Sequence, residues 1–285
     1  MSQLRERLTA GTFVVTAEIA PPKGTQVAAE VETARQLSGM TAINVTDNQG
    51  ANMRLSPLVM ATLLRQAGIE PILQLTCRDR NRMALQSDLL GAAALGIENL
   101  LLLSGDHARF GDHPQARSVF DLDSVQLLQA VNTLMAGTDM SGKKLDGVPA
   151  FFAGAAVSPE MEPFELMFQK YRKKVESGAA FFQTQAVFDA GKVERFMAEA
   201  RPLGRPVLAG VLLLRSAGMA RFLNANIPGV HVPDALIERL EKATKPLDEG
   251  VLIAREMVAV TRDCCQGVHL MTLGHEGRIP EILAG

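Results

Sequence analysis

Two acidic residues, Glu18 and Asp106, follow segments that have the composition of buried β-strands. Glu18 comes after the apolar, β-branched segment 13–17, and Asp106 comes shortly after the leucine-rich segment 99–103. Prolines at 21 and 22 end the first segment, because proline has no N–H to donate to a sheet. An acid at the tip of a buried strand stands where an α/β barrel carries its catalytic groups, although a glutamate before a turn is as often a solvated surface residue. The other strand ends decide between these interpretations.

Polar residues follow most of the other predicted strands. They are Thr46, Asp47, Asn48, Gln49, Gln74, Thr76, Ser104, Ser158, Thr184, Gln185 and Thr272. In a parallel barrel all strands end at one rim, so we expect these side chains to gather there. The set offers carboxylates, amides and hydroxyls, but it has no Ser-His-Asp order and no C-x-x-C that would indicate a nucleophile. Such groups suit a polar heterocycle, and one carboxyl kept neutral could serve as an acid.

Strand-like and helix-like patterns alternate along the chain. Strands are predicted at 13–17, 41–46, 71–76, 99–103, 148–157, 180–185, 207–214 and 267–272, and helices at 27–37, 57–67, 81–95, 124–135, 163–176, 193–200, 217–225, 234–242 and 250–262. This alternation predicts the α/β class and one (β/α)8 TIM barrel domain over residues 1–285, with an N-terminal helical extension and extra helices before the last strand. A doubly wound open sheet is the alternative, but no G-x-G-x-x-G or G-x-x-x-x-G-K-[ST] loop is present in the sequence.

Composition excludes several classes of function. The 285 residues are 47% hydrophobic, with a net charge of −2, so no basic field exists to attract nucleic acid or an anionic membrane. No apolar run reaches the roughly 20 residues that span a bilayer, and the charged N-terminus is unlike a signal peptide. We expect a cytoplasmic protein. Its three cysteines and five histidines lack metal-ligand spacing, which predicts reduced thiols and no metal.

Four motifs resemble the methylenetetrahydrofolate reductase family, which are flavoproteins with a (β/α)8 barrel. E-I-A-P-P at 18–22 is similar to the family's Glu-x-x-Pro-Pro, Q-L-T-C at 74–77 to its H-L-T-C, and L-S-G-D at 103–106 to its x-x-Gly-Asp. The run Y-R-K-K-V-E-S-G-A at 171–179, followed by T-Q-A-V-F-D at 184–189, resembles the family's basic helix, glycine turn and T-Q-x-x-F-D. Singly these motifs are weak, but they occur in the family's order over residues 13–273.

The resemblance implies a reaction of one-carbon metabolism and methionine biosynthesis. Reduced flavin passes a hydride to the methylene carbon of 5,10-methylenetetrahydrofolate, giving 5-methyltetrahydrofolate. Glu18 matches the family's general acid, and burial beside an apolar flavin would keep part of it protonated near neutral pH. Asp106 matches the acid that hydrogen-bonds the pterin and favours a cationic intermediate. Gln185 matches the amide that reads the pterin edge.

The implied cofactor is FAD, with FMN as the alternative because both present a phosphate. The residues implied to contact it are Thr46, Gln74, Ser104, Gly105, Asp106, Phe120, Asp121, Phe152, Gly154, Lys173 and Lys174. The two lysines would supply the fixed positive charge that a diphosphate requires. They are equally well explained as the solvated last turn of a helix.

The sequence also departs from the family pattern. Gln74 stands where many members have histidine, Ser104 where some have arginine, and Ala217 where some have an aromatic residue. The V-T-D-N-Q segment at 45–49 looks more like members from acetate-forming anaerobes, some of which take electrons from partner subunits. The donor is therefore NAD(P)H or a partner subunit, and a homo-oligomer or hetero-complex is possible in either case. A non-catalytic folate- or flavin-binding subunit is the alternative function; a flavin-free pterin methyltransferase barrel is a third, disfavoured by Glu18, Asp106 and Gln185 together.

Overall fold

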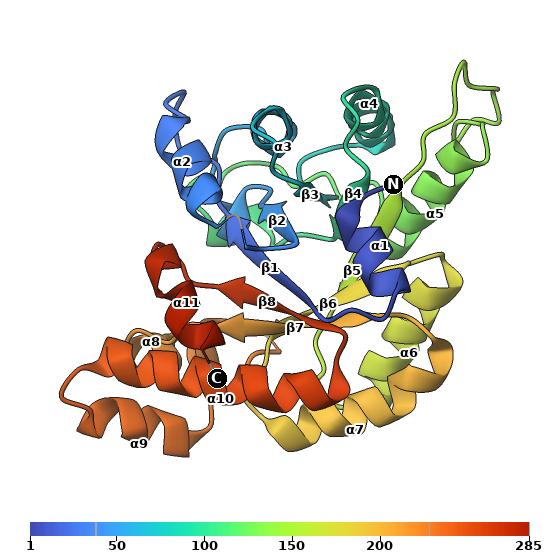
Figure 1. Ribbon diagram of the computed structural model, residues 1–285. Helices are drawn as coiled ribbons and strands as arrows, with labels where there is room; N and C mark the ends of the chain where they lie inside the picture. Colours follow the sequence, from blue (N-terminus) through green and yellow to red (C-terminus); the bar gives the residue numbers. More distant parts are fainter. Residues whose placement is uncertain (38, 228, 285) are drawn as a thin grey trace. The chain divides into compact units, whose positions relative to one another are not determined.

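The strands follow one another around a closed barrel in the order β1-β2-β3-β4-β5-β6-β7-β8 (Figure 1). The computed structural model describes residues 1–37, 39–227 and 229–284. The strands are β1 (Val14–Ile19), β2 (Ala42–Val45), β3 (Pro71–Thr76), β4 (Asn99–Leu103), β5 (Phe152–Val157), β6 (Phe181–Ala186), β7 (Val207–Leu212) and β8 (Gly267–Met271). Neighbouring strands pair in parallel, as β3 with β4 and β7 with β8. The predicted α/β class and (β/α)8 barrel are confirmed.

Helices connect these strands, as parallel pairing requires. They are α1 (Gln3–Thr9), α2 (Ala28–Gln36), α3 (Pro57–Gln66), α4 (Arg82–Ala94), α5 (Ser124–Met135), α6 (Phe164–Glu176), α7 (Ala190–Ala200), α8 (Ala217–Asn226), α9 (Asp234–Lys242), α10 (Pro246–Cys264) and α11 (Ile279–Leu283). Short 3-10 turns include η1 (Gln49–Ala51) and η2 (Ala108–Phe110).

Local chemistry explains where several helices begin. The Asp123 side chain accepts the N–H of Gln126, and the Gln126 side chain accepts the N–H of Asp123, which forms a capping box before α5. Asn81 caps α4 through the N–H groups of Met83 and Ala84. The strands are largely buried, and every residue of β3 and β7 is buried. Helices cover a parallel barrel from outside, and side chains fill its interior.

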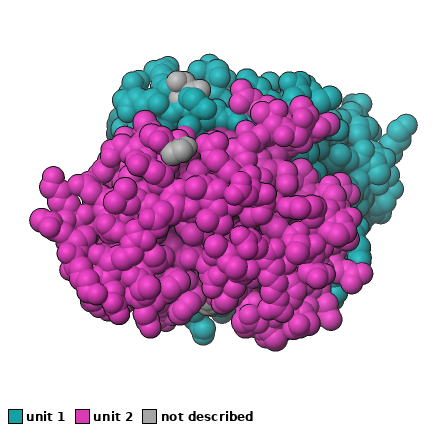
Figure 2. Space-filling view, turned by 60° about the horizontal axis from the view of Figure 1, so that its bottom comes forward, with its two compact units in different colours: residues 1–6, 18–155, 173–181 teal, residues 7–17, 156–172, 182–285 magenta. Residues whose placement is uncertain are grey.

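The chain divides into two compact units, which Figure 2 colours teal and magenta. Unit 1 comprises residues 1–6, 18–155 and 173–181, and unit 2 comprises residues 7–17, 156–172 and 182–285. Unit 1 holds β2 to β4 with α2 to α5. Unit 2 holds β7 and β8 with α7 to α10, and its core includes Phe188, Leu214, Val232 and Ile253. A single domain over residues 1–285 stays a prediction.

Candidate active site

Glu18 lies in unit 1 as the last residue but one of β1, and its side chain is partly buried. We expected it just after the strand, but β1 continues to Ile19, whose carbonyl accepts the N–H of Thr46 at 3.2 Å. The Nε2 of Gln49 donates to Oε1 of Glu18 at 3.1 Å. Gln49 opens η1, four residues after the end of β2. The candidate acid of one strand is thus held by an amide from the next.

Asp106 follows β4 by three residues, and its side chain is exposed. Gly105, the residue before it, has a φ of +86°, which residues other than glycine rarely adopt. A Cβ at Gly105 would lie 2.9 Å from Cβ of Thr76. The glycine therefore lets the β4 loop pass close against the end of β3 and turns Asp106 outward.

Unit 1 also contains a buried ion pair between Asp47 and Arg80. The Asp47 side chain is fully buried and accepts from the N–H and Oγ1 of Thr76 at 2.8 and 2.9 Å. The Nη1 of Arg80 donates to the Asp47 carboxylate at 2.7 Å. The Nε of Arg80 also pairs with the Asp88 carboxylate at 2.8 Å. Burial acts to lower the pKa of Arg80, but the charge and hydrogen bonds of Asp47, together with the charges of Asp88 and Asp79, outweigh this and raise it. Asp47 and Thr76, expected at the rim, bind protein groups instead.

The loop 104–121 is fastened to the neighbouring loops of unit 1. Asp112 pairs with Lys23, accepts the N–H of Met53 at 3.0 Å, and contacts Nδ1 of His113 at 2.8 Å. Hydrogen bonds from Lys23 and then His113 hold the pKa of this exposed carboxyl well below its usual range. A Cβ on Gly111 would lie 1.8 Å from the carbonyl oxygen of Ala51. The long loop therefore has a defined conformation against η1.

The residues implied to contact a flavin have different environments. Thr46 is 2% exposed, and its hydroxyl has no hydrogen-bond partner among the described residues. The amide of Gln74 is buried and donates to Oδ1 of Asn44 at 3.2 Å. A Cβ at Gly154 would lie 2.4 Å from the ring of Phe181. Phe152 stacks on that ring with centroids 5.1 Å apart.

Phe120 and Asp121 lie at the entrance to α5. Phe120 is 39% exposed with a φ of +42°, and its ring centroid is 6.1 Å from that of His107. Asp121 binds the guanidinium of Arg82 through both oxygens at 2.9 Å. These hydrogen bonds lower the pKa of Asp121 to about 2. Asp121 is therefore already committed to a protein cation.

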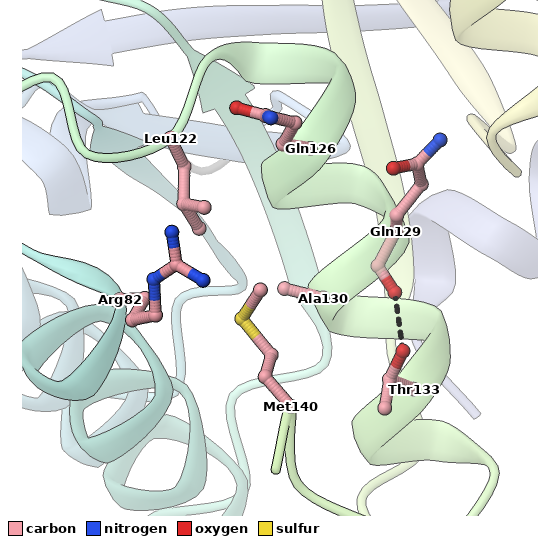
Figure 3. A pocket seen from close by; sticks show the side chains of 7 residues that line it. All are labelled: Arg82, Leu122, Gln126, Gln129, Ala130, Thr133 and Met140. Atoms are coloured by element: carbon pink, nitrogen blue, oxygen red, sulfur yellow. Dashed lines mark hydrogen bonds between the residues drawn. The ribbon is translucent and has the colours of Figure 1, made fainter. Parts of the chain in front are cut away.

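A cavity of about 290 Å³ lies beside this pair, between α4 and α5 (Figure 3). Its lining comes from Arg82, Leu122, Gln126, Gln129, Ala130, Thr133 and Met140. The side chain of Met140 projects toward Arg82 and Ala130 (Figure 3). The cavity contains neither Glu18 nor Asp106, so it is separate from the candidate active site.

The remaining predicted residues are at other positions in the fold. Ser104 is exposed directly after β4, and Lys173 and Lys174 occupy the last turn of α6. Gln185 lies in β6 of unit 2 with an exposed side chain. The predicted meeting of Gln185 with Glu18 and Asp106 stays a prediction.

Sequence reasoning missed Arg78 as a site residue, and it missed the contact between Gln49 and Glu18. Arg78 is 2% exposed and donates to the backbone around both Asn48 and Asp106. The signal was the R-D-R run at 78–80, since charges directly after a fully buried strand need partners. Gln49 belonged to the polar set after strand two, but its partner in β1 was not visible from spacing.

The family model described as methylenetetrahydrofolate reductase matches residues 3–285. The chain belongs to the methylenetetrahydrofolate reductase family. Among curated relatives, it is 24% identical over 236 residues to a probable methylenetetrahydrofolate reductase (NADPH) of Caenorhabditis elegans, covering 80% of this chain and 34% of that protein. It is 27% identical over 252 residues to methylenetetrahydrofolate reductase 2 of Schizosaccharomyces pombe, covering 82% of this chain and 38% of that one. The chain thus spans about a third of the length of these relatives.

A solved structure shares the fold over nearly the whole chain. It is an uncharacterized protein from Clostridium thermocellum that binds two copies of 5-methyl-5,6,7,8-tetrahydrofolic acid. The TM-score is 0.66 at 16% identity, covering 99% of this chain and 97% of that one.

Burial, followed by the charges of Asp123 and Asp47, raises the pKa of the Cys77 thiol to about 12, so this thiol is a poor nucleophile. Within the described ranges, no three His, Cys, Asp or Glu side chains are grouped so that they could hold a metal ion. No helix of the described chain has the length and apolarity to cross a bilayer.

Proposed function

We propose that this chain is a flavin-dependent 5,10-methylenetetrahydrofolate reductase that produces 5-methyltetrahydrofolate. The observation that carries the proposal is Glu18, a partly buried carboxyl at the end of a barrel strand, held by the Gln49 amide in a chain of this family. The folate bound by the Clostridium thermocellum protein is the product of the proposed reaction. This supports a folate as the ligand class.

The residues of unit 1 fit a flavin. Thr46 presents a buried hydroxyl that lacks a partner in the described part of the chain, and a ring nitrogen or carbonyl of a flavin would satisfy it. Lys173 and Lys174 offer positive charge for its phosphates. When bound, the flavin supplies the hydride. We propose FAD, with FMN as the alternative.

Glu18 would donate its proton to the ring nitrogen of the folate that departs as the five-membered ring opens. The reaction then needs a cationic substrate carbon, and the negative charge of Asp106 would stabilise it while its oxygens accept from the pterin. Gln185 would hydrogen-bond the pterin edge. Electrons would come from NAD(P)H or from a partner subunit.

The test is reduction of methylenetetrahydrofolate by the flavin-loaded chain. The flavin of the purified protein is reduced and the protein is then mixed with the folate. The rate of the reaction is measured from the return of the absorbance spectrum of oxidised flavin. We expect Glu18→Gln to keep flavin and folate binding but to lose at least about 100-fold in this step, as when a general acid is removed. Glu32→Gln on the exposed face of α2 is the matched control.

Each other outcome has a defined meaning. Protein that takes up neither FAD nor FMN contradicts the proposal. Protein that binds both ligands but is inactive with every donor supports the non-catalytic subunit. Folate reduction by Glu18→Gln at the parent rate overturns the role of Glu18.

A further inference from the structure

The contact between Gln49 and Glu18 joins η1 to the end of strand β1. The Nε2 of Gln49 lies 3.1 Å from Oε1 of Glu18, 31 residues away. Gln49 is exposed, so burial does not hold its side chain in place. Its position must come from the backbone that carries it.

That backbone has an unusual conformation. Asn48 has a φ of +45° and Ala51 a φ of +60°, on either side of Gly50 at +62°. Non-glycine residues in the left-handed region cost energy and persist only where their surroundings determine them. Strain of this kind gathers at functional sites. The groups that hold this turn in its conformation therefore also set the position of Gln49.

Arg78 fixes it. Its Nη2 donates to the carbonyl of Asn48 at 3.2 Å, and its Nη1 donates to the carbonyl of Asp106 at 3.3 Å. Asp79 holds the guanidinium through Nε and Nη2, both at 2.8 Å, and also accepts from Nδ2 of Asn48 at 3.1 Å. Only the planar, five-donor guanidinium can reach both loops at once; a lysine ammonium is a point charge.

We propose that Gln49 is a positioning residue for Glu18 and that Arg78 acts on Glu18 through Gln49. This inference rests on the proposed function, in which Glu18 is the acid. An amide suits the task because it donates to the carboxylate through nitrogen and, turned over, accepts from the protonated acid through oxygen. Glu18 therefore keeps one orientation before and after it gives up its proton. By holding the Asp106 carbonyl, Arg78 also ties both candidate acids to one support.

The first experiment measures how Glu18 titrates, independently of any reaction. Carbon-13 NMR of glutamate-labelled protein gives its titration curve, assigned by the signal lost in Glu18→Gln. The hydrogen bond from an amide N–H to a charged carboxylate is stronger than the one that the amide oxygen accepts from a neutral acid, so Gln49→Leu should move the midpoint upward. Gln36→Leu, an exposed glutamine at the end of α2, should leave it unchanged. An unchanged midpoint in Gln49→Leu overturns the inference, even if the chain proves not to be a reductase.

The second experiment separates Arg78 from a purely structural role. Arg78→Lys keeps the charge but loses the bridge, so it should move the Glu18 midpoint in the same direction. If Arg78 acts through Gln49, the double variant should move it no further than Gln49→Leu alone. Additive shifts would show that Arg78 acts by another route.

The third experiment uses the reaction. In single-turnover folate reduction, Gln49→Leu should lower the plateau rate roughly tenfold through lost orientation and move the high-pH fall in rate upward. Flavin content and folate affinity should match the parent. A parent-like pH profile would contradict the inference, whereas a parent chain with no folate reduction would contradict only the proposed function.

Discussion

Asp47→Ala should destabilise this protein more than any exposed charge removal nearby. The Asp47 side chain is fully buried and accepts four hydrogen bonds, two from Thr76 and two from Arg80 at 2.7 and 3.3 Å. Truncation leaves the Arg80 guanidinium, 16% exposed, with Asp88 as its remaining described partner. It also leaves both donors of Thr76 without their acceptor.

The size of the effect follows from these contacts. Breaking a buried pair by removing one partner costs about 3–5 kcal/mol, because the other charge stays buried. Asp88 offsets part of that cost for Arg80, so we expect about 3–4 kcal/mol, or a fall in Tm of about 6–8 °C. Asp47→Asn keeps an oxygen for Thr76 and should cost about 2 kcal/mol. Asp88→Ala, at a side chain 34% exposed, should cost less than about 1 kcal/mol.

Urea unfolding of the three variants, and of Arg80→Met alone and with Asp47→Ala, is the measurement. The double variant should be less destabilised than the sum of the single variants, because each alone leaves its partner charge buried. A cost below about 1 kcal/mol for Asp47→Ala, or simple additivity, would refute the reasoning.

Two further predictions concern packing and pH. Gly111→Ala places a Cβ 1.8 Å from the carbonyl oxygen of Ala51, and because this atom belongs to the backbone it cannot move away without strain, so we expect the free energy of unfolding to fall by about 1–3 kcal/mol. Gly277→Ala is the control, since a Cβ there would have nothing within 4 Å, and equal melting curves for the two variants would contradict the prediction. In unit 2, Glu160 accepts the N–H groups of Phe188 and Asp189 at 2.6 and 2.7 Å, yet burial raises its pKa. The folded protein thus favours the neutral form of Glu160. The stability that this protonation contributes is fully present below the ordinary pKa of 4.5 and is lost as the pH rises through the raised pKa of the folded state. Glu160→Gln should therefore raise Tm over the parent at pH 8 but not at pH 4; the same difference at both would count against it.

The sequence was most informative about elements whose ends carry local signals. The helix Ser124–Met135 was predicted to the residue, because its start is a capping box. The start of α10 at Pro246 was missed, since the prediction placed it at Gly250 and passed over the proline that opens the first turn. The strand predicted from Val148 begins at Phe152, whose N–H bonds the carbonyl of Glu98. Such ends depend on a partner strand, and no local pattern encodes them.

The candidate site divides in the same way. That Glu18 and Asp106 lie at or near the ends of barrel strands could be predicted from periodicity, because each strand stands out in the sequence as a separate hydrophobic segment. That Asp47 is buried while Gln49, two residues on, is exposed could not, because both are polar residues of one turn. The difference arises from two arginines that follow the next strand, β3. Arg80 binds the Asp47 side chain, and Arg78 donates to the carbonyl of Asn48. In this protein the arginines after β3 bind some of the polar residues after β2 and leave others available for chemistry. Which residues they bind depends on contacts between neighbouring strands, which the local sequence does not encode.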